Sequence, residues 1–123
     1  MLFRSIFFLV LENICTRLLN KKWNNYNVSQ IPRVEGIYVI ETTHPSKKVV
    51  YVGRSKDIHQ RMLEHKKQDS AIDKFVQENF NENGGVHLRV KWIEEQDQKR
   101  KESDFICCVT NKLGYKPSFN AHG

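Results

Sequence analysis

Gly36-Ile37-Tyr38-Val39-Ile40 and Val49-Val50-Tyr51-Val52-Gly53 are two short apolar runs joined by a polar segment that contains a proline. Their β-branched and aromatic residues favour strands, so the runs predict a β-hairpin. Side chains alternate between the two faces of a sheet. A turn of two or four residues would put Tyr38 opposite Tyr51 or Gly53, with both phenols on one face. A loop with an odd number of residues would put them on opposite faces.

The segment after the hairpin predicts two helices. Asp57, with Gln60 three residues later, has the pattern of a helix N-cap. Arg61 and His65 are four residues apart, so they lie on one stripe of the helix that follows. A second helix is expected to start at Ser70, which has an acidic residue three positions later.

The remaining elements complete the fold prediction. Apolar residues alternate from Val86 to Trp92, which predicts a half-buried strand. A last helix is predicted from about Glu95 to Leu113, ended by Gly114. Its Glu102 lies on the inward stripe, where a carboxylate needs either a basic side chain or a metal ion. The order of elements predicts an α+β fold with a small three-stranded antiparallel sheet flanked by helices.

Residues 1–33 are expected to form an N-terminal helical extension of a domain at residues 34–123. Apolar residues recur at helical spacing from Leu2 to Leu18, which favours an amphipathic helix packed on the domain over a targeting peptide. The apolar run at residues 6–11 is too short to span a bilayer. A polar loop at Asn24–Asn27 is expected to follow the helix. The helix could also mediate self-association.

The net charge of +6 is unevenly distributed. Residues 44–67 contain seven basic and two acidic residues, whereas residues 68–123 contain eight basic and nine acidic residues. A basic surface of this kind favours a polyanionic partner, although a solvated lysine surface gives the same pattern. The expected nucleic-acid contacts are the five lysines of the basic stretch: Lys47, Lys48, Lys56, Lys66 and Lys67.

The three cysteines have no metal-ligand spacing, and two of them are adjacent, at Cys107 and Cys108. Neighbouring cysteines seldom pair with each other, because the geometry is poor. An odd number without a framework favours an intracellular, reducing compartment. Nucleus, cytoplasm and mitochondrion all remain open.

The chain resembles the GIY-YIG endonucleases over roughly residues 34–120. The two motifs that name this family stand as Gly36-Ile37-Tyr38 and Tyr51-Val52-Gly53. Each tripeptide alone is weakly specific, but further positions of the family are filled in the right order. These are a basic residue after the second motif, an arginine and a histidine in the next helix, a glutamate in a later helix and a terminal asparagine: Arg54, Arg61, His65, Glu102 and Asn120.

The resemblance implies a site for phosphodiester hydrolysis. Glu102 would bind one Mg²⁺ ion, for which Mn²⁺ can substitute, and such a cation polarises the phosphate and stabilises the leaving group. Arg61 would bind the non-bridging oxygens, because a guanidinium matches phosphate bidentately. The resemblance also includes Asn120 among the catalytic residues.

The general base has two candidates. The resemblance implies Tyr38, with Tyr51 orienting water or phosphate. A phenol has a pKa of about 10, and nearby cations such as Arg54 and the metal would lower it. His65 is the alternative, since its free pKa is about 6.5. The sequence does not separate these two assignments.

The leading hypothesis is therefore a Mg²⁺-dependent endonuclease that cleaves DNA by nicking or by structure-selective cutting. RNA remains open as a partner, and no membrane partner is expected. One alternative is a catalytically inactive nucleic-acid-binding module, and another is a protein-interaction adaptor. Each site residue also has an ordinary structural alternative, such as a sheet tyrosine or an exposed helix residue. Roles in repair, mobile elements, restriction and organelles all remain open.

Overall fold

From residue 36 onward, helices and strands follow the order that the sequence predicts. The computed structural model describes residues 15–21, 24–43, 46–79 and 85–120. The strands are β1 (Asn24–Tyr26), β2 (Gly36–Thr42), β3 (Lys48–Ser55) and β4 (Gly85–Glu94). The helices are α2 (Ile58–His65), α3 (Ala71–Glu78) and α4 (Gln98–Leu113), with short 3-10 turns η1 (Val28–Gln30) and η2 (Ser118–Asn120).

The sheet has the order β1-β4-β2-β3, with every neighbouring pair antiparallel. The predicted three-stranded antiparallel sheet is confirmed as β4-β2-β3. The predicted polar loop at Asn24–Asn27 is wrong in part, because residues Asn24–Tyr26 form β1 on the outer edge of β4. Tyr26 explains the difference: its ring is buried, and its hydroxyl donates to the Met62 carbonyl oxygen at 2.7 Å.

A β-bulge sets the faces of the β2–β3 hairpin. Thr42 pairs with Lys48, so the loop between them has five residues, an odd number. An odd loop alone would place the two tyrosines on opposite faces. However, the register shifts between Ile40 and Glu41, where β3 contributes one extra residue. The shift pairs Tyr38 with Gly53, and the two phenols return to one face.

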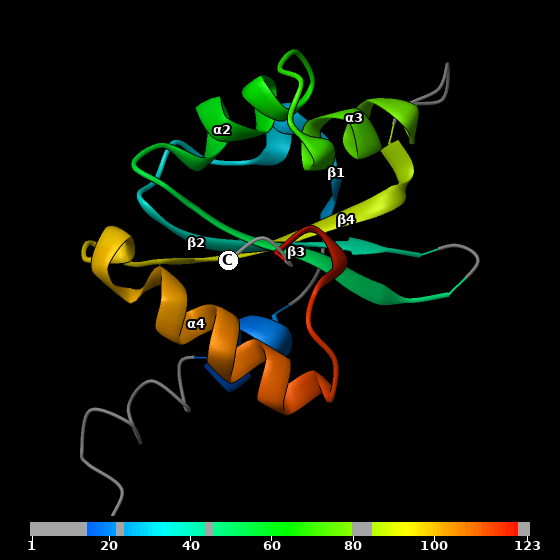
Figure 1. The fold of residues 1–123 in the computed structure, drawn as a ribbon. Helices are drawn as coiled ribbons and strands as arrows, with labels where there is room; N and C mark the ends of the chain where they lie inside the picture. Colours follow the sequence, from blue (N-terminus) through cyan, green and yellow to red (C-terminus); the bar gives the residue numbers. More distant parts are fainter. Residues whose placement is uncertain (1–14, 22–23, 44–45, 80–84, 121–123) are drawn as a thin grey trace, which may run out of the picture.

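The sheet lies between two helical layers. In Figure 1, α2 and α3 cover one face, and α4 crosses the other. Strict alternation along β2 divides the core accordingly. Tyr38 and Ile40 pack on the α2 and α3 side, whereas Ile37 and Val39 pack with Phe105 on the α4 side.

Local capping signals determine where the helices begin and end. The Asp57 side chain accepts from the Gln60 backbone N–H at the start of α2, and Ser70 and Asp73 form a complete capping box on α3. α4 begins at Gln98, later than the expected Glu95, because the Glu95 N–H donates to the Glu35 carbonyl oxygen and extends the strand pairing.

The expected N-terminal helix lies largely outside the described residues. Residues 15–19 are helical, and Cys15 and Leu18 are buried in the core on the α4 side. Lys91 binds this turn to the sheet, since its Nζ donates to the Leu19 carbonyl oxygen at 2.7 Å and pairs with Glu41 at 3.3 Å. Within the described part of the chain, no helix is long and apolar enough to cross a membrane.

Candidate functional site

The two hairpin tyrosines lie side by side but differ in exposure. Their ring centroids are 6.1 Å apart on the face covered by α2 and α3. Tyr38 is 0% exposed, whereas Tyr51 is partly exposed. Gly53 makes this arrangement possible, because a Cβ atom there would collide with the Tyr38 phenol and lie 2.6 Å from Tyr51 Cε2. The second motif therefore needs glycine for close packing.

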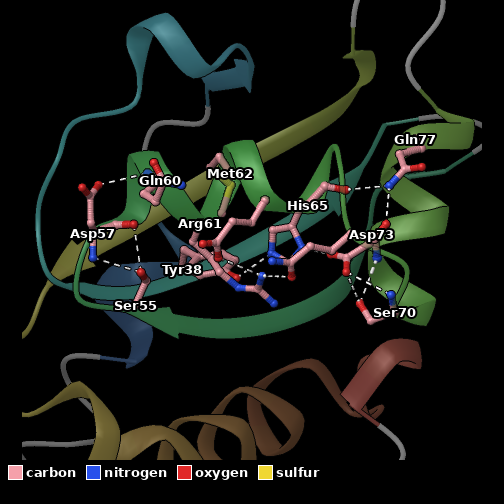
Figure 2. A network of polar contacts seen from close by, with 12 residues as sticks. Tyr38, Ser55, Asp57, Gln60, Arg61, Met62, His65, Ser70, Asp73 and Gln77 are labelled. Atoms are coloured by element: carbon pink, nitrogen blue, oxygen red, sulfur yellow. Dashed lines mark hydrogen bonds and ion pairs between the residues drawn. The ribbon is translucent and has the colours of Figure 1, made fainter.

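A chain of hydrogen bonds runs from Tyr38 into α3 (Figure 2). The Tyr38 hydroxyl lies 2.7 Å from His65 Nε2, and His65 Nδ1 lies 2.6 Å from Asp73 Oδ1. The other carboxylate oxygen, Asp73 Oδ2, accepts from the Ser70 N–H at 3.0 Å and the Ser70 hydroxyl at 2.6 Å. His65 and Asp73 are 0% and 1% exposed.

The surroundings of these three hydrogen-bonded side chains give them different charge states. Burial, followed by the positive charge of Arg61, lowers the pKa of His65 to about 4. Burial acts to raise the pKa of Asp73, but hydrogen bonds from Ser70 and His65 together lower it. Burial raises the pKa of the Tyr38 phenol well above its usual range. At neutral pH this series of hydrogen-bonded groups therefore consists of a neutral phenol, a neutral imidazole and an ionised carboxylate.

Stability should consequently fall in mild acid. The unfolded chain protonates His65 near its ordinary pKa of 6.5, and the folded chain only near 4. The unfolded state thus binds more protons in this window, so the free energy of unfolding decreases as the pH falls from 6.5 to 4, by on the order of 3 kcal/mol. Urea unfolding across this range should show a steeper decrease for the wild type than for His65→Gln. Parallel pH dependences would contradict the shift.

Arg61 of α2 is a partly exposed cation that acts on both tyrosines. The positive charge of its guanidinium favours the charged forms of both phenols. It also donates to Glu64 Oε1 and Gln68 Oε1, each at 3.3 Å, and its side chain is 23% exposed. A half-buried guanidinium with N–H groups beside a phenol and open to solvent is suited to bind an anion.

Glu102 of α4 approaches the same edge strand from the opposite layer. Its Oε1 lies 3.4 Å from Arg54 Nε, and its side chain is 32% exposed. Burial is the main cause of the raised pKa of the Tyr51 phenol; the charge of Arg61 opposes it, and the charge of Glu102 adds to it. Glu102 and Tyr51 are therefore electrostatic neighbours around β3.

The expected role of Arg54 needs correction. Arg54 was expected to lower the pKa of Tyr38, but it alternates to the α4 face of β3, where it contacts Glu102 and Gln98. Arg61 is the cation that acts on Tyr38 instead. The inward glutamate thus has a basic side chain as a partner, and its binding of a metal ion stays a prediction.

A metal ion would have one protein ligand here. Among the described residues, no group of three or more His, Cys, Asp or Glu side chains is arranged to bind a metal. Mg²⁺ does not require such a group, since it keeps several waters and is often bound by one or two carboxylates together with substrate phosphates. The partly exposed Glu102 carboxylate, in a loose ion pair, fits that requirement.

Asn120 binds the backbone of the edge strand β3. Its Oδ1 accepts from the Val52 N–H at 2.7 Å, and its Nδ2 donates to the Val52 carbonyl oxygen at 2.9 Å. Nearby, the Tyr115 hydroxyl accepts from the Val49 N–H at 3.0 Å. The tail after α4 thus covers unpaired backbone groups of β3. Both polar atoms of the Asn120 amide are occupied, which gives the residue a structural task, and its catalytic role stays a prediction.

Asn120→Ala should therefore lower stability more than activity. The Val52 N–H and carbonyl groups would lose their partner, which should cost about 1–3 kcal/mol in the free energy of unfolding. The cleavage rate, measured where the variant is fully folded, should stay within about tenfold of the wild type. A larger loss of rate with unchanged stability would return Asn120 to the catalytic residues.

The five lysines expected to bind nucleic acid are all exposed. Lys47 and Lys48 lie at one end of β3 and Lys56 at the other, while Lys66 and Lys67 follow α2. The Lys48 ammonium lies 5.5 Å from the Tyr115 ring centroid. Nucleic-acid binding by the five lysines stays a prediction.

Asp73 contacts the site through His65, which the sequence did not predict, and Ser70 caps the same helix. Their spacing predicted a helix start, which is confirmed. The same carboxylate also binds His65, eight residues earlier. This second contact follows from the packing of α2 against α3, which no local pattern encodes.

The site combines two phenols, a guanidinium and a carboxylate on an α+β sheet, and these groups are suited to bind a phosphate ester. The family model of the GIY-YIG catalytic domain matches residues 34–106, more than half of the chain. The chain therefore belongs to the GIY-YIG family, whose domains are generally nucleases, and the resemblance read from the motifs is confirmed. Comparisons with curated proteins and with solved structures gave no match.

Proposed function

We propose that this protein is a divalent-metal-dependent endonuclease that hydrolyses DNA phosphodiester bonds. The observation that supports this most is the meeting of groups from both helical layers around β3. Tyr51 and Arg61 approach on the α2 side, and Glu102 approaches from α4 and acts on Tyr51 electrostatically. Catalysis of this reaction needs anion binding, a proton acceptor and a cation at the phosphate, and these residues supply each of them.

Arg61 is proposed to bind the scissile phosphate. Its guanidinium interacts electrostatically with two phenols and is partly open to solvent. A guanidinium can donate to two phosphate oxygens at once and strengthens its interaction as negative charge develops. A cation bound by Glu102 would add polarisation of the phosphate and stabilisation of the leaving oxygen.

Exposure divides the two tyrosines between different tasks. Tyr38 is 0% exposed and its hydroxyl is used by His65, so it does not face a substrate directly. Tyr51 is partly exposed; burial raises the pKa of its phenol, and the charge of Arg61 opposes this rise. We therefore propose Tyr51 as the group that accepts the proton from water, in the phenolate form that a cation bound by Glu102 would favour. Tyr38 and His65, the two candidates considered from the sequence, pack against the Tyr51 ring.

A cleavage panel tests this proposal. The full chain is incubated with duplex, flap, bubble, junction and single-stranded DNA, each with Mg²⁺, with Mn²⁺ and with EDTA. We expect cleavage of at least one substrate with either metal and none with EDTA, because the metal compensates charge in the transition state. Salt-dependent binding without cleavage of any substrate would overturn the endonuclease and favour a binding module.

A further inference from the structure

A buried carboxylate of α3 has two oxygens with different partners. Asp73 Oδ2 completes the capping box with Ser70, and Asp73 Oδ1 binds His65 Nδ1 at 2.6 Å. The cap needs only one of the oxygens. The other oxygen belongs to a residue that is 1% exposed, and it contacts an imidazole that is itself fully buried. Helix capping therefore leaves the contact with His65 unexplained.

The hydrogen-bond chain beyond Asp73 has only one consistent direction. An ionised carboxylate can only accept, so His65 carries its proton on Nδ1. His65 Nε2 then has a lone pair and accepts the Tyr38 hydroxyl proton at 2.7 Å. The Tyr38 oxygen is left as an acceptor, and the Arg61 guanidinium, which has donors only, acts on it electrostatically.

We propose that Asp73 is a positioning residue of the nuclease site, which selects the His65 tautomer and, through Tyr38, holds the Arg61 guanidinium toward the substrate. This inference rests on the proposed function for its catalytic consequence only. The tautomer and the placement of Arg61 are properties of the folded chain without substrate. Asp73 touches no substrate, so it acts through His65 and Tyr38.

Asp73→Asn is expected to reverse the direction of the hydrogen bonds between residue 73, His65 and Tyr38. The asparagine carbonyl oxygen can keep the helix cap by accepting from the Ser70 N–H, which turns the amide NH₂ toward His65. His65 Nδ1 must then accept, and Nε2 becomes the donor to the Tyr38 oxygen. The Tyr38 proton would consequently point at Arg61, which also has only donors. Two donors would then face each other, and the guanidinium would move away from Tyr38.

Ser70→Ala is the matched control. It removes the capping hydroxyl but leaves Asp73 Oδ1 on His65, so it perturbs the start of α3 without reversing the chain. We expect Asp73→Asn to lower kcat by at least about tenfold, as loss of an oriented charge-stabilising donor does. Ser70→Ala should leave kcat within about twofold while lowering the melting temperature.

The deciding measurement is ¹⁵N NMR of the histidine ring nitrogens and of the arginine Nε–H groups in the full chain at neutral pH. The wild type and Ser70→Ala should show His65 as the Nδ1–H tautomer, and Asp73→Asn should show Nε2–H with a shifted Arg61 signal. An Nε2–H tautomer in the wild type, which needs no variant to fold, would overturn the proposal. An unchanged Arg61 signal in folded Asp73→Asn would overturn it too. Absence of wild-type cleavage would count against the proposed function and leave these spectra as the test.

Discussion

Glu102→Gln is expected to abolish metal-dependent cleavage while leaving DNA binding close to the wild type. The substitution keeps the shape of the side chain but removes the charge, and a neutral amide is a poor ligand for Mg²⁺. The loss of rate should be on the order of 10³-fold, equivalent to about 4 kcal/mol of activation free energy. Cleavage rates and fluorescence anisotropy with labelled DNA measure the two effects separately.

The structure offers a control on the same helix. Asp104 lies two residues along α4 and is partly exposed, so Asp104→Asn removes an equal charge from a different face of the same helix. It should leave cleavage within about twofold, since long-range electrostatics at the surface are screened by salt. Glu102→Gln should change stability little, because its pair with Arg54 is about one-third exposed on both sides. Cleavage by Glu102→Gln within about tenfold of the wild type would remove Glu102 from the metal site.

Gly53→Ala is expected to disrupt both the fold and the site. The added methyl group would collide with the Tyr38 phenol and lie against Tyr51. Tyr38 cannot move aside, because it is fully buried and hydrogen-bonded to His65. We expect a decrease of about 3 kcal/mol in the free energy of unfolding, as overpacking of a core produces, together with loss of cleavage. Urea unfolding and near-ultraviolet circular dichroism of the tyrosines measure these effects.

Gly114→Ala is the control that measures the backbone cost of replacing a glycine without a steric collision. Gly114 has a φ of 79°, and a Cβ atom added there would meet no other atom within 4 Å, so the cost of the substitution comes from backbone conformation alone. It should lower the free energy of unfolding by about 1 kcal/mol and leave the tyrosine signal and the cleavage rate unchanged. If Gly53→Ala behaved like Gly114→Ala, the close packing of the two phenols over Gly53 would be refuted.

Elements with a local cause were predictable from the sequence. The cap at Asp57, the helix start at Ser70 and the glycine that ends α4 each depend on residues within one helical turn, and all three are confirmed. Strand β1 was missed, because its polar sequence has no strand pattern. It is held by pairing with β4 and by the burial of Tyr26, both of which are long-range.

Motifs and spacing were enough to predict which residues gather at the site, since the hairpin and the helix after it bring Tyr38, Tyr51 and Arg61 together. What each of them can do depends on the folded arrangement of the layers. A bulge in β3 placed both phenols on one face despite the odd loop. Packing of α2 on α3 then buried Tyr38 and gave His65 its carboxylate partner. Exposure, charge state and proton direction depend on neighbours distant in sequence, and these contacts form only when the layers close around the sheet.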